Sequence, residues 1–295
     1  MSTELKPIDQ QVMVITGASS GIGLATAISA AARGAKVALL ARSEETLDEI
    51  VMSIEGDGGE ALAIPVDVAD RQAVEAAADQ VVSRFGRIDT WVNNAGVSIY
   101  GRIEEVSDED NRRLFETNFW GVVYGSLAAL PYLRQAGGSL VNVGSEVSDA
   151  VVPLQGMYST SKHAVKGFTD SLRVEVELVE KAAVSISLIQ PTAVNTPYPE
   201  HARNYMDKEP KLPTPQIDPY QVADAIIDAA TQGGRDIKVG AMSKMNTLMA
   251  SLLPRLADRM SAMQAQRQQK DQSPRTPEGA LFEGGQSGRV YGTAP

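Results

Sequence analysis

The feature that most constrains this chain is the alternation of short apolar runs with segments of helical pattern. Seven apolar runs occur, at residues 12–15, 36–41, 61–66, 88–93, 139–143, 184–189 and 236–239. Helical segments separate them, at residues 21–33, 44–55, 70–85, about 108–130, 156–181 and 219–231. The runs are apolar throughout, which indicates strands buried on both faces. The alternation therefore predicts an α/β fold, a doubly wound parallel sheet of about seven strands in a single domain.

Composition limits the kinds of site that the chain can carry. It has 295 residues, no Cys and only two His, His163 and His201. Disulfides, thiolate metal sites, cysteine nucleophiles and multi-histidine metal sites are therefore excluded, and we expect no metal centre. No apolar run reaches the roughly 18 residues that cross a bilayer, and the polar start lacks a signal-peptide core. We therefore expect a soluble, cytoplasmic protein.

Charge divides the chain into two segments. Residues 1–240 carry a net charge of −13, whereas residues 241–295 carry +3. An acidic body argues against nucleic-acid binding, which depends on Lys and Arg neutralising phosphates. We expect residues 1–240 to form a dinucleotide-binding and catalytic domain, and residues 241–295 to form a C-terminal extension.

A glycine-rich turn follows the first predicted strand. Residues 16–23 read TGASSGIG, with glycines at Gly17, Gly21 and Gly23. Such a turn lets backbone N–H groups approach a pyrophosphate at the start of the next helix. Glycines also serve plain tight turns, but the position between the first strand and the first helix favours a dinucleotide site. The residues expected to contact the cofactor here are Gly17, Ser19, Ser20, Gly21, Ile22 and Gly23.

Two side chains after the second and third strands bear on the choice of cofactor. Arg42 stands where an acidic residue would bind the ribose 2′-hydroxyl of NAD, and an arginine there accommodates a 2′-phosphate instead. We therefore favour NADP(H) over NAD(H), although a surface arginine at a strand end is the alternative. Asp67, followed by Val68, is placed to contact the adenine amino group. A helix N-terminal charge is a nearly equal interpretation of Asp67.

A possible catalytic group lies near the start of the helix at 156–181. The i, i+4 spacing of Tyr158 and Lys162 puts both side chains on one helix face. A nearby ammonium favours the phenolate, so we expect Lys162 to lower the pKa of Tyr158 toward a range useful for proton transfer. Ser145, directly after the fifth strand, could hydrogen-bond the same substrate oxygen. Asn118 could hold a water that links Lys162 to solvent, or could be a buried asparagine bonded to backbone.

Taken together, these motifs resemble the short-chain dehydrogenase/reductase superfamily over residues 11–240. TGASSGIG, the NNAG at residues 93–96, Asn118, Ser145 and the YSTSK that starts at Tyr158 occur in that family's order and spacing. The resemblance implies that Tyr158 exchanges a proton with the substrate oxygen while the nicotinamide transfers hydride. It also implies that Ser145 orients that oxygen, that Lys162 binds the nicotinamide ribose and that Asn118 completes a proton relay. Further cofactor contacts are expected at Asn94, Ala95, Gly96, Tyr158, Lys162, Pro191 and Thr196.

One position departs from the family pattern, and it precedes a long loop. Thr192 replaces the usual Gly after Pro191, which removes a flexible position beside the expected nicotinamide site. Residues 192–218 hold five prolines and are too long for a simple connection, as lids and binding loops often are. The resemblance makes this the substrate loop, and its candidate lining residues are Tyr198, His201, Tyr205 and Met206. We assign no catalytic role to His201, and a structural role to His163.

The C-terminal extension begins with an amphipathic pattern. Met and Leu recur at spacings of three and four from Met242 to Met263, bent or restarted at Pro254. This segment could pack on its own domain or on a second subunit, cover the substrate cleft as a Met-rich wall, or lie on a membrane surface. Its few, scattered basic residues make the membrane the weakest of the three. Residues 270–295 are expected to be irregular or disordered, or to wrap the surface.

The sequence thus predicts an NADP(H)-dependent oxidoreductase that interconverts a carbonyl and a secondary alcohol. An NAD-dependent dehydrogenase with the same site, and a redox-silent protein that senses a dinucleotide or acts as a scaffold, remain alternatives. The predicted partners are a small carbonyl or alcohol substrate and, by the resemblance, further copies of the chain. The helices at 108–130 and 156–181 would then form a homodimer or homotetramer interface. The substrate itself cannot be derived from the sequence.

Overall fold

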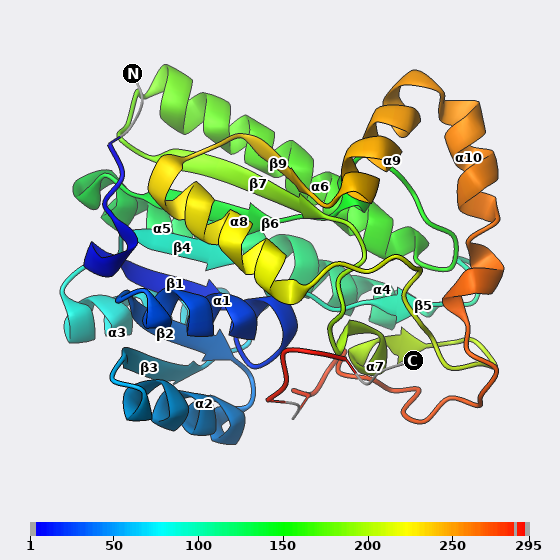
Figure 1. Ribbon diagram of the computed structural model, residues 1–295, viewed down its shortest axis with the longest axis horizontal. Coiled ribbons are helices and arrows are strands. Elements are labelled where there is room, and N and C mark those ends of the chain that lie inside the picture. Colours follow the sequence, from blue (N-terminus) through cyan, green and yellow to red (C-terminus); the bar gives the residue numbers. More distant parts are fainter. Residues whose placement is uncertain (1–3, 286–287, 293–295) are drawn as a thin grey trace.

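A computed structural model describes residues 4–285 and 288–292 of the chain. Its centre is a parallel sheet in the order β3-β2-β1-β4-β6-β7-β9 (Figure 1). The doubly wound α/β fold predicted from the alternating runs is confirmed. The strands are β1 Val12–Thr16, β2 Lys36–Ala41, β3 Glu60–Pro65, β4 Thr90–Asn93, β6 Ser139–Val143, β7 Ser185–Pro191 and β9 Asp236–Val239.

The central strands are apolar throughout because both faces of the sheet are covered. In β1, Met13 and Ile15 pack into one hydrophobic core, whereas Val12 and Val14 pack into the other. Successive side chains of a strand point to opposite faces, so each needs an apolar partner layer. All five residues of β1 are buried.

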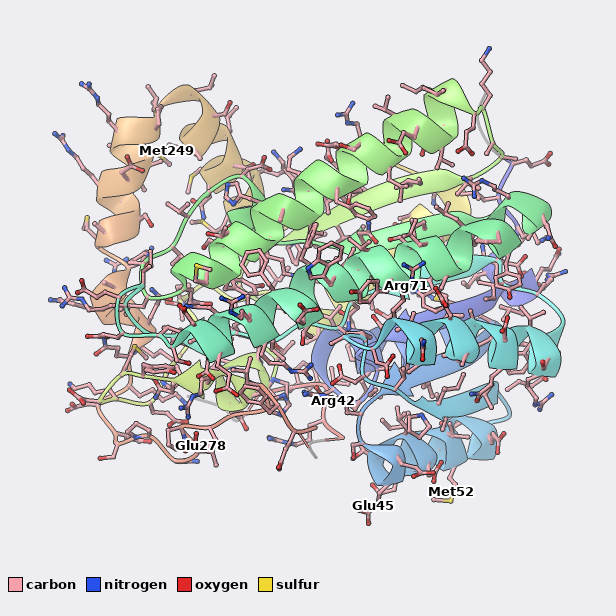
Figure 2. All side chains as sticks on the ribbon, turned by 180° about the vertical axis from the view of Figure 1, so that it is seen from behind. Arg42, Glu45, Met52, Arg71, Met249 and Glu278 are labelled. Carbon is pink, nitrogen blue, oxygen red and sulfur yellow. The ribbon has the colours of Figure 1, made fainter. Side chains whose placement is uncertain are left out.

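Each face of the sheet is covered by helices that follow the strands. One layer contains α1 Gly21–Ala32, α2 Glu44–Gly56 and α8 Pro219–Gln232, and α1 packs against α8. The other layer contains α3 Arg71–Phe85, α5 Gly121–Ala136 and α6 Gly156–Arg173, and it is the nearer layer in Figure 2. The strand order reverses direction between β1 and β4. Ligands of such folds bind at this point, outside the carboxyl ends of the strands.

Two of the long helical segments are interrupted by π-helical turns. The segment predicted at 108–130 consists of α4 Asp108–Phe115, a π turn at Glu116–Trp120 and α5. The segment predicted at 156–181 is α6 followed by a second π turn at Val174–Val179. Such single-turn bulges often occur at functional sites. The first of them contains Asn118.

A second, two-stranded sheet lies outside the main one. It pairs β5 Ile99–Tyr100 with β8 Arg203–Asn204 in parallel, next to the short helix α7 Tyr198–His201. This pairing joins the segment after β4 to the long loop after β7. Strands of two residues carry no periodicity, so the sequence did not predict them.

The C-terminal segment lies beyond the carboxyl ends of the strands. Helices α9 Ala241–Leu252 and α10 Pro254–Ala262 follow β9 and stand at one end of the molecule (Figure 1). A 3-10 turn, Ala265–Gln268, leads into an irregular segment that passes along the loop after β7 and returns toward the first strand–helix turn. Within the described part of the chain, no helix is long and apolar enough to span a bilayer.

Candidate active site

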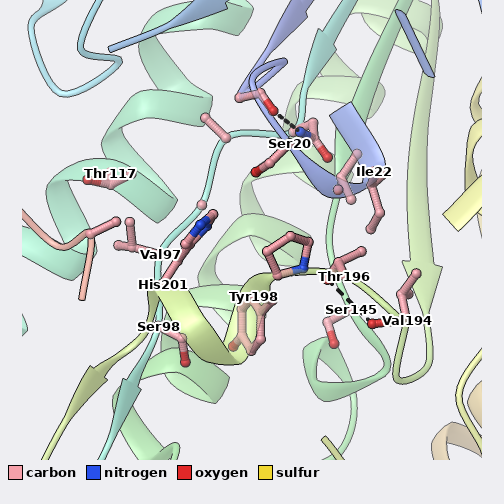
Figure 3. A pocket seen from close by; sticks show the side chains of 18 of the residues that line it. Ser20, Ile22, Val97, Ser98, Thr117, Ser145, Val194, Thr196, Tyr198 and His201 are labelled. Atoms are coloured by element: carbon pink, nitrogen blue, oxygen red, sulfur yellow. Dashed lines mark hydrogen bonds between the residues drawn. The ribbon is translucent and has the colours of Figure 1, made fainter. Parts of the chain in front are cut away.

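A cavity of about 280 Å³ lies at the carboxyl ends of the main-sheet strands (Figure 3). Sixteen of the eighteen site residues expected from the sequence line it, from segments that follow six different strands. Gly23 and Asn118 do not line it. The residues brought together are Gly17, Ser19, Ser20, Gly21, Ile22, Arg42, Asp67, Val68, Asn94, Ala95, Gly96, Ser145, Tyr158, Lys162, Pro191 and Thr196.

The glycine-rich turn is packed tightly against the NNAG segment. Gly17 and Gly21 have φ angles of +66° and +55°, which favour glycine. A Cβ on Gly17 would lie 2.7 Å from Ala95 Cα, and one on Gly23 would lie 2.2 Å from the carbonyl oxygen of Gly17. Gly23 therefore has a packing role beneath the turn. Asn94 stabilises the turn from the other side, because its Nδ2 donates to the backbone carbonyl oxygen of Thr16 at 2.9 Å.

The start of α1 presents backbone N–H groups to the cavity. Ser20 is extended and its side chain makes no capping bond, so backbone donors at the first turn stay available. These donors and the helix dipole suit an anion such as a pyrophosphate. One donor has a partner from the C-terminal segment, since the Gly21 N–H donates to the Arg289 carbonyl at 2.9 Å. The remaining backbone N–H groups and the glycines of this turn therefore fit the pyrophosphate of a dinucleotide.

Arg42 lies where the sequence predicts it, but it also contacts the C-terminal segment. Its guanidinium donates to the carbonyls of Ala280 at 2.6 Å and Leu281 at 3.3 Å. Leu281 is fully buried against Val97 and Leu114, which anchors this segment over the cavity. We call residues 277–285 and 288–292 the strap. No local pattern in the sequence indicated that the strap would reach Arg42, about 240 residues away along the chain.

Asp67 lines the cavity and forms an ion pair with Arg113. Its other carboxylate oxygen accepts from the Ala69 N–H at 3.0 Å, in the turn before α3, whereas the N-terminus of that helix is capped by Asp70. Arg113 also donates to the Leu281 carbonyl at 3.1 Å. The strap, α4 and the end of β3 therefore meet at this carboxylate.

Ser145, Tyr158 and Lys162 converge on the opposite part of the same cavity. Ser145 follows β6 and caps a short turn, Glu146–Ser148, while Tyr158 and Lys162 lie one turn apart on α6. Lys162 Nζ donates to the Val143 carbonyl at 2.8 Å and lies 5.8 Å from the centre of the Tyr158 ring. Burial lowers the pKa of Lys162 to about 8.

The pKa of Tyr158 moves in the direction opposite to the one expected from Lys162. Burial raises it, although hydrogen bonds with Tyr198 and Ser145 act to lower it. Removing the phenol from water disfavours the charged phenolate. The Lys162 ammonium is turned to the Val143 carbonyl and does not compensate. The raised pKa therefore favours the neutral, protonated Tyr158 hydroxyl in this structure.

Asn118 is fully buried behind the cavity and is bonded to the backbone. Its Oδ1 accepts from the Val97 N–H at 2.8 Å, and its Nδ2 donates to the Val97 carbonyl at 2.9 Å and to Ser161 Oγ at 3.1 Å. These contacts match the second of the two interpretations left open by the sequence. The π turn turns Asn118 inward and fixes the segment that leads to β5.

A polar network that the sequence analysis missed lies beside Tyr158. Tyr198 and Ser98 both donate to Gln155 Oε1, at 2.9 and 3.1 Å. Gln155 in turn donates to Gln268 Oε1 at 2.7 Å, and both glutamines line the cavity. The ring of Tyr198 meets that of Tyr158 edge-on, with centroids 5.6 Å apart. Isolated glutamines carry no motif, so only the tertiary contacts reveal the network.

The long loop after β7 contributes some of its candidate residues to the site. Tyr198 and His201 line the cavity, whereas Tyr205 donates from its hydroxyl to Asp110 and lies outside it with Met206. Burial lowers the pKa of His201, so the uncharged imidazole is favoured.

Thr192, at the position that departs from the family pattern, donates its N–H to the Val239 carbonyl at 3.1 Å. His163 bonds the Ser159 carbonyl within α6.

A parallel doubly wound sheet with a glycine-rich turn and a Ser-Tyr-Lys group at one cavity defines a nicotinamide-dinucleotide oxidoreductase class. A family model described as short chain dehydrogenase matches residues 11–206. The chain belongs to the short-chain dehydrogenase family, as the sequence motifs predicted. It is therefore an oxidoreductase of that family.

Three relatives place the chain within the family. It is 43% identical to an uncharacterized oxidoreductase, YxnA, from Bacillus subtilis, over 96% of this chain and 80% of that protein. It is similar to an alcohol dehydrogenase from Thermococcus sibiricus complexed with 5-hydroxy-NADP, with 30% identity, a TM-score of 0.68, and coverage of 78% and 94%. It is also similar to an L-sorbose reductase from Gluconobacter frateurii complexed with NADPH and L-sorbose, with 26% identity, a TM-score of 0.69, and coverage of 81% and 97%.

Proposed function

We propose that this protein is an NADP(H)-dependent oxidoreductase that interconverts a carbonyl compound and a secondary alcohol. The observation that carries the proposal is the convergence of Ser145, Tyr158 and Lys162 on the cavity that also contains the glycine-rich turn. A dinucleotide held by that turn would extend across the carboxyl ends of the strands toward these three side chains.

The chain's own residues divide into those that hold the cofactor and those that act on the substrate. The turn from Gly17 to Ile22 would hold the pyrophosphate, and Arg42 and Asp67 would contact the adenosine end. The bound nicotinamide supplies hydride to the carbonyl carbon, or accepts it from the alcohol. Lys162 would hold the nicotinamide ribose and contribute positive charge below its pKa of about 8.

Tyr158 is the proposed general acid and base. Its buried hydroxyl, with a raised pKa, would donate a proton to the carbonyl oxygen as the alcohol forms and remove it in the reverse direction. Ser145 would hydrogen-bond the same oxygen and hold it near Tyr158. The hydrogen bonds that Tyr158 makes with Tyr198 and Ser145 keep the hydroxyl in place.

The activity is tested by following NADPH oxidation with a panel of carbonyl compounds. Turnover is expected for the wild-type protein, and Tyr158→Phe should lower kcat by about 10²–10⁴-fold, the usual contribution of a general acid. NADPH affinity should change far less than kcat, because the glycine-rich turn, Arg42 and Lys162 stay in place. NADPH binding without turnover on the panel would instead favour the sensor or scaffold.

The preference for NADP(H) rests on the charge of Arg42. Two relatives in complex with NADP-type cofactors have the same fold, and a guanidinium is suited to a 2′-phosphate. Arg42→Asp should shift the ratio of NADPH to NADH efficiency by more than about tenfold toward NADH. Because Arg42 also contacts the strap, Arg113→Ala serves as the control, which removes a strap contact without removing the Arg42 charge. An unchanged ratio in Arg42→Asp would contradict the assignment.

We also propose that the chain assembles as a homodimer or homotetramer through the face formed by α5, α6 and the π turns. Large apolar side chains are exposed there, among them Trp120, Leu127, Val174 and Leu178. Large exposed apolar side chains on one face of a protein are typical of protein interfaces. Sedimentation of the wild type and of Leu178→Glu tests the proposal.

The cytoplasmic location stays a prediction, tested by fractionation of the source cells.

A further inference from the structure

A second cavity, of about 260 Å³, lies between the C-terminal helices and the loops at the catalytic end of the sheet. Helices α9 and α10 form one side of it. The segments 146–152 and 213–215, after β6 and β7, form the other side. Figure 2 shows Met249, one of its lining residues, on α9 at the end of the molecule where the C-terminal helices lie.

The second cavity adjoins the catalytic cavity on its substrate side. Six residues line both cavities, and all of them come from the loops after β6 and β7. No residue of the glycine-rich turn or of the adenosine end, where Arg42 lies, belongs to this shared set. The shared wall is Glu146, Val147, Val152, Thr192, Ala193 and Pro213.

Hydrogen bonds hold the helices over these loops, so the second cavity has a defined outer wall. Asn246 Nδ2 donates to Glu146 Oε2 at 3.0 Å, and Ser261 Oγ donates to the Val151 carbonyl at 2.6 Å. Further along, Gln268 Nε2 donates to the Pro153 carbonyl at 2.8 Å. The extension is therefore attached to the segment that begins immediately after Ser145.

The lining of the second cavity combines apolar side chains with several neutral polar ones, and its charged side chains are all acidic. Methionines from both helices, Met242, Met249 and Met260, face valines and alanines of the opposite loop. Flexible thioether side chains adapt to apolar ligands of varied shape. The charged side chains in the lining are Glu146, Asp149 and Asp258, and none of the described residues that line it is Lys, Arg or His. A carboxylate or phosphate on a ligand would find no counter-charge there.

We propose that the second cavity takes the apolar tail of an elongated, uncharged substrate whose carbonyl or secondary alcohol lies at Ser145 and Tyr158. This inference rests on the proposed oxidoreductase function and adds the class of substrate. Long-chain neutral ketones and alcohols fit the lining, whereas chains that end in a carboxylate or phosphate do not. Each methylene that enters the cavity should strengthen binding by about fourfold until the cavity is filled.

The test compares two methyl ketones, 2-butanone and 2-undecanone, with NADPH. We expect 2-undecanone to have a kcat/KM more than about tenfold higher, mainly through KM. Ala250→Trp, which fills the second cavity, should remove this advantage and leave 2-butanone turnover unchanged. Leu248→Trp is the matched control, because Leu248 lies on the exposed side of the same helix. Equal effects of the two substitutions, or no dependence on chain length, would overturn the inference.

The exclusion of anionic chains has its own test. We expect 10-oxoundecanoate, the same chain ending in a carboxylate, to be used at least about tenfold less efficiently than 2-undecanone. Asp258→Lys should narrow this gap, whereas Asp48→Lys, an equal change of charge on the exposed face of α2, should not. A carboxylate chain used as well as the neutral one by the wild type would contradict an acidic, cation-free lining.

A binding measurement separates failure of this inference from failure of the proposed function. Calorimetric titration with 2-undecanol needs no turnover, and Ala250→Trp should weaken binding by more than about tenfold relative to Leu248→Trp. If 2-undecanol binds in this way but no ketone is reduced, the cavity assignment stands and the proposed function fails. If ketones are reduced but 2-undecanol binds equally to both variants, the proposed function stands and this inference fails.

Discussion

The floor and the cover of the catalytic cavity are built in different ways. The floor consists of the segments directly after β1, β2, β4 and β6 together with the start of α6, and it is held by backbone conformation and close packing of backbone atoms. The Gly17 turn against Ala95 is an example. The cover consists of the loop after β7 and the strap, and it is held by contacts between residues far apart in the chain. Arg42 bonded to Ala280 and Leu281 is an example.

This difference assigns the proposed chemistry to residues of the floor and the choice of substrate to residues of the cover. The floor carries the proposed catalytic side chains Tyr158, Lys162 and Ser145. A shift of about 1 Å in such side chains would lower the rate of catalysis strongly. Tyr198, Gln155 and Gln268 join the floor to the cover through side-chain hydrogen bonds. Members of the family can therefore keep one reaction while the cover changes what reaches it.

The largest effect is expected from disturbing the floor at the glycine-rich turn. Gly23→Ala would place a Cβ 2.2 Å from the Gly17 carbonyl oxygen, and a backbone atom cannot move aside. We expect the free energy of unfolding to fall by about 3 kcal/mol or more, and NADPH binding to weaken by more than about tenfold. Chemical denaturation and titration with NADPH measure the two effects.

Gly167→Ala is the control for this substitution. Gly167 is an exposed glycine within α6, and an added Cβ would meet nothing within 4 Å. Alanine there should raise stability by about 0.5–1 kcal/mol through helix propensity. If both glycine substitutions behaved alike, the tight packing of the floor would be refuted.

An intermediate effect is expected from the buried charge on the floor. Burial lowers the pKa of Lys162 to about 8 from the ordinary 10.5, so between these values the unfolded chain binds more protons here than the folded chain. Wild-type stability relative to Lys162→Met should therefore rise with pH across this window, by at most about 3 kcal/mol. Urea unfolding at a series of pH values measures the difference.

Lys166→Met provides the comparison of opposite sign. Burial lowers the pKa of Lys166, but its ion pair with Asp170 raises it on balance. Its contribution to stability should be present at neutral pH and decline as pH rises through the raised pKa. A Lys162→Met difference that stayed flat with pH would show that Lys162 keeps its ordinary pKa.

The smallest effect on global stability is expected from loosening the cover. Leu281 is fully buried in the strap, whereas Phe282 beside it is half exposed. Leu281→Ala should let the strap open locally, so that trypsin cleaves at Arg275 and Arg289 more than about tenfold faster. Global stability should change by less than about 1 kcal/mol. Phe282→Ala should leave the cleavage rate unchanged, and equal rates in the two variants would argue against Leu281 as the anchor.

The sequence predicted the floor well because its signals are local. The seven main strands lie within two or three residues of their predicted ends, and the Gly17 turn, Ser145 and the Tyr158–Lys162 pair each follow from neighbours in the chain. The direction of the Tyr158 pKa was wrong in the sequence analysis. Helical spacing places Lys162 near the ring, but burial and the Val143 carbonyl decide what the charge does.

The sequence by itself determined the parallel sheet, the oxidoreductase family and the chain positions of Ser145, Tyr158 and Lys162, which line one cavity. Apolar periodicity, glycine conformation and i, i+4 spacing act over a few residues and are readable in one dimension. Only the tertiary structure decided that the strap reaches Arg42, that Gln268 joins the Tyr198 network and that α9 and α10 enclose a second cavity. The hydrogen bonds that make these contacts join residues 100 or more positions apart. Their energy depends on shape and burial, which no local pattern of residues encodes.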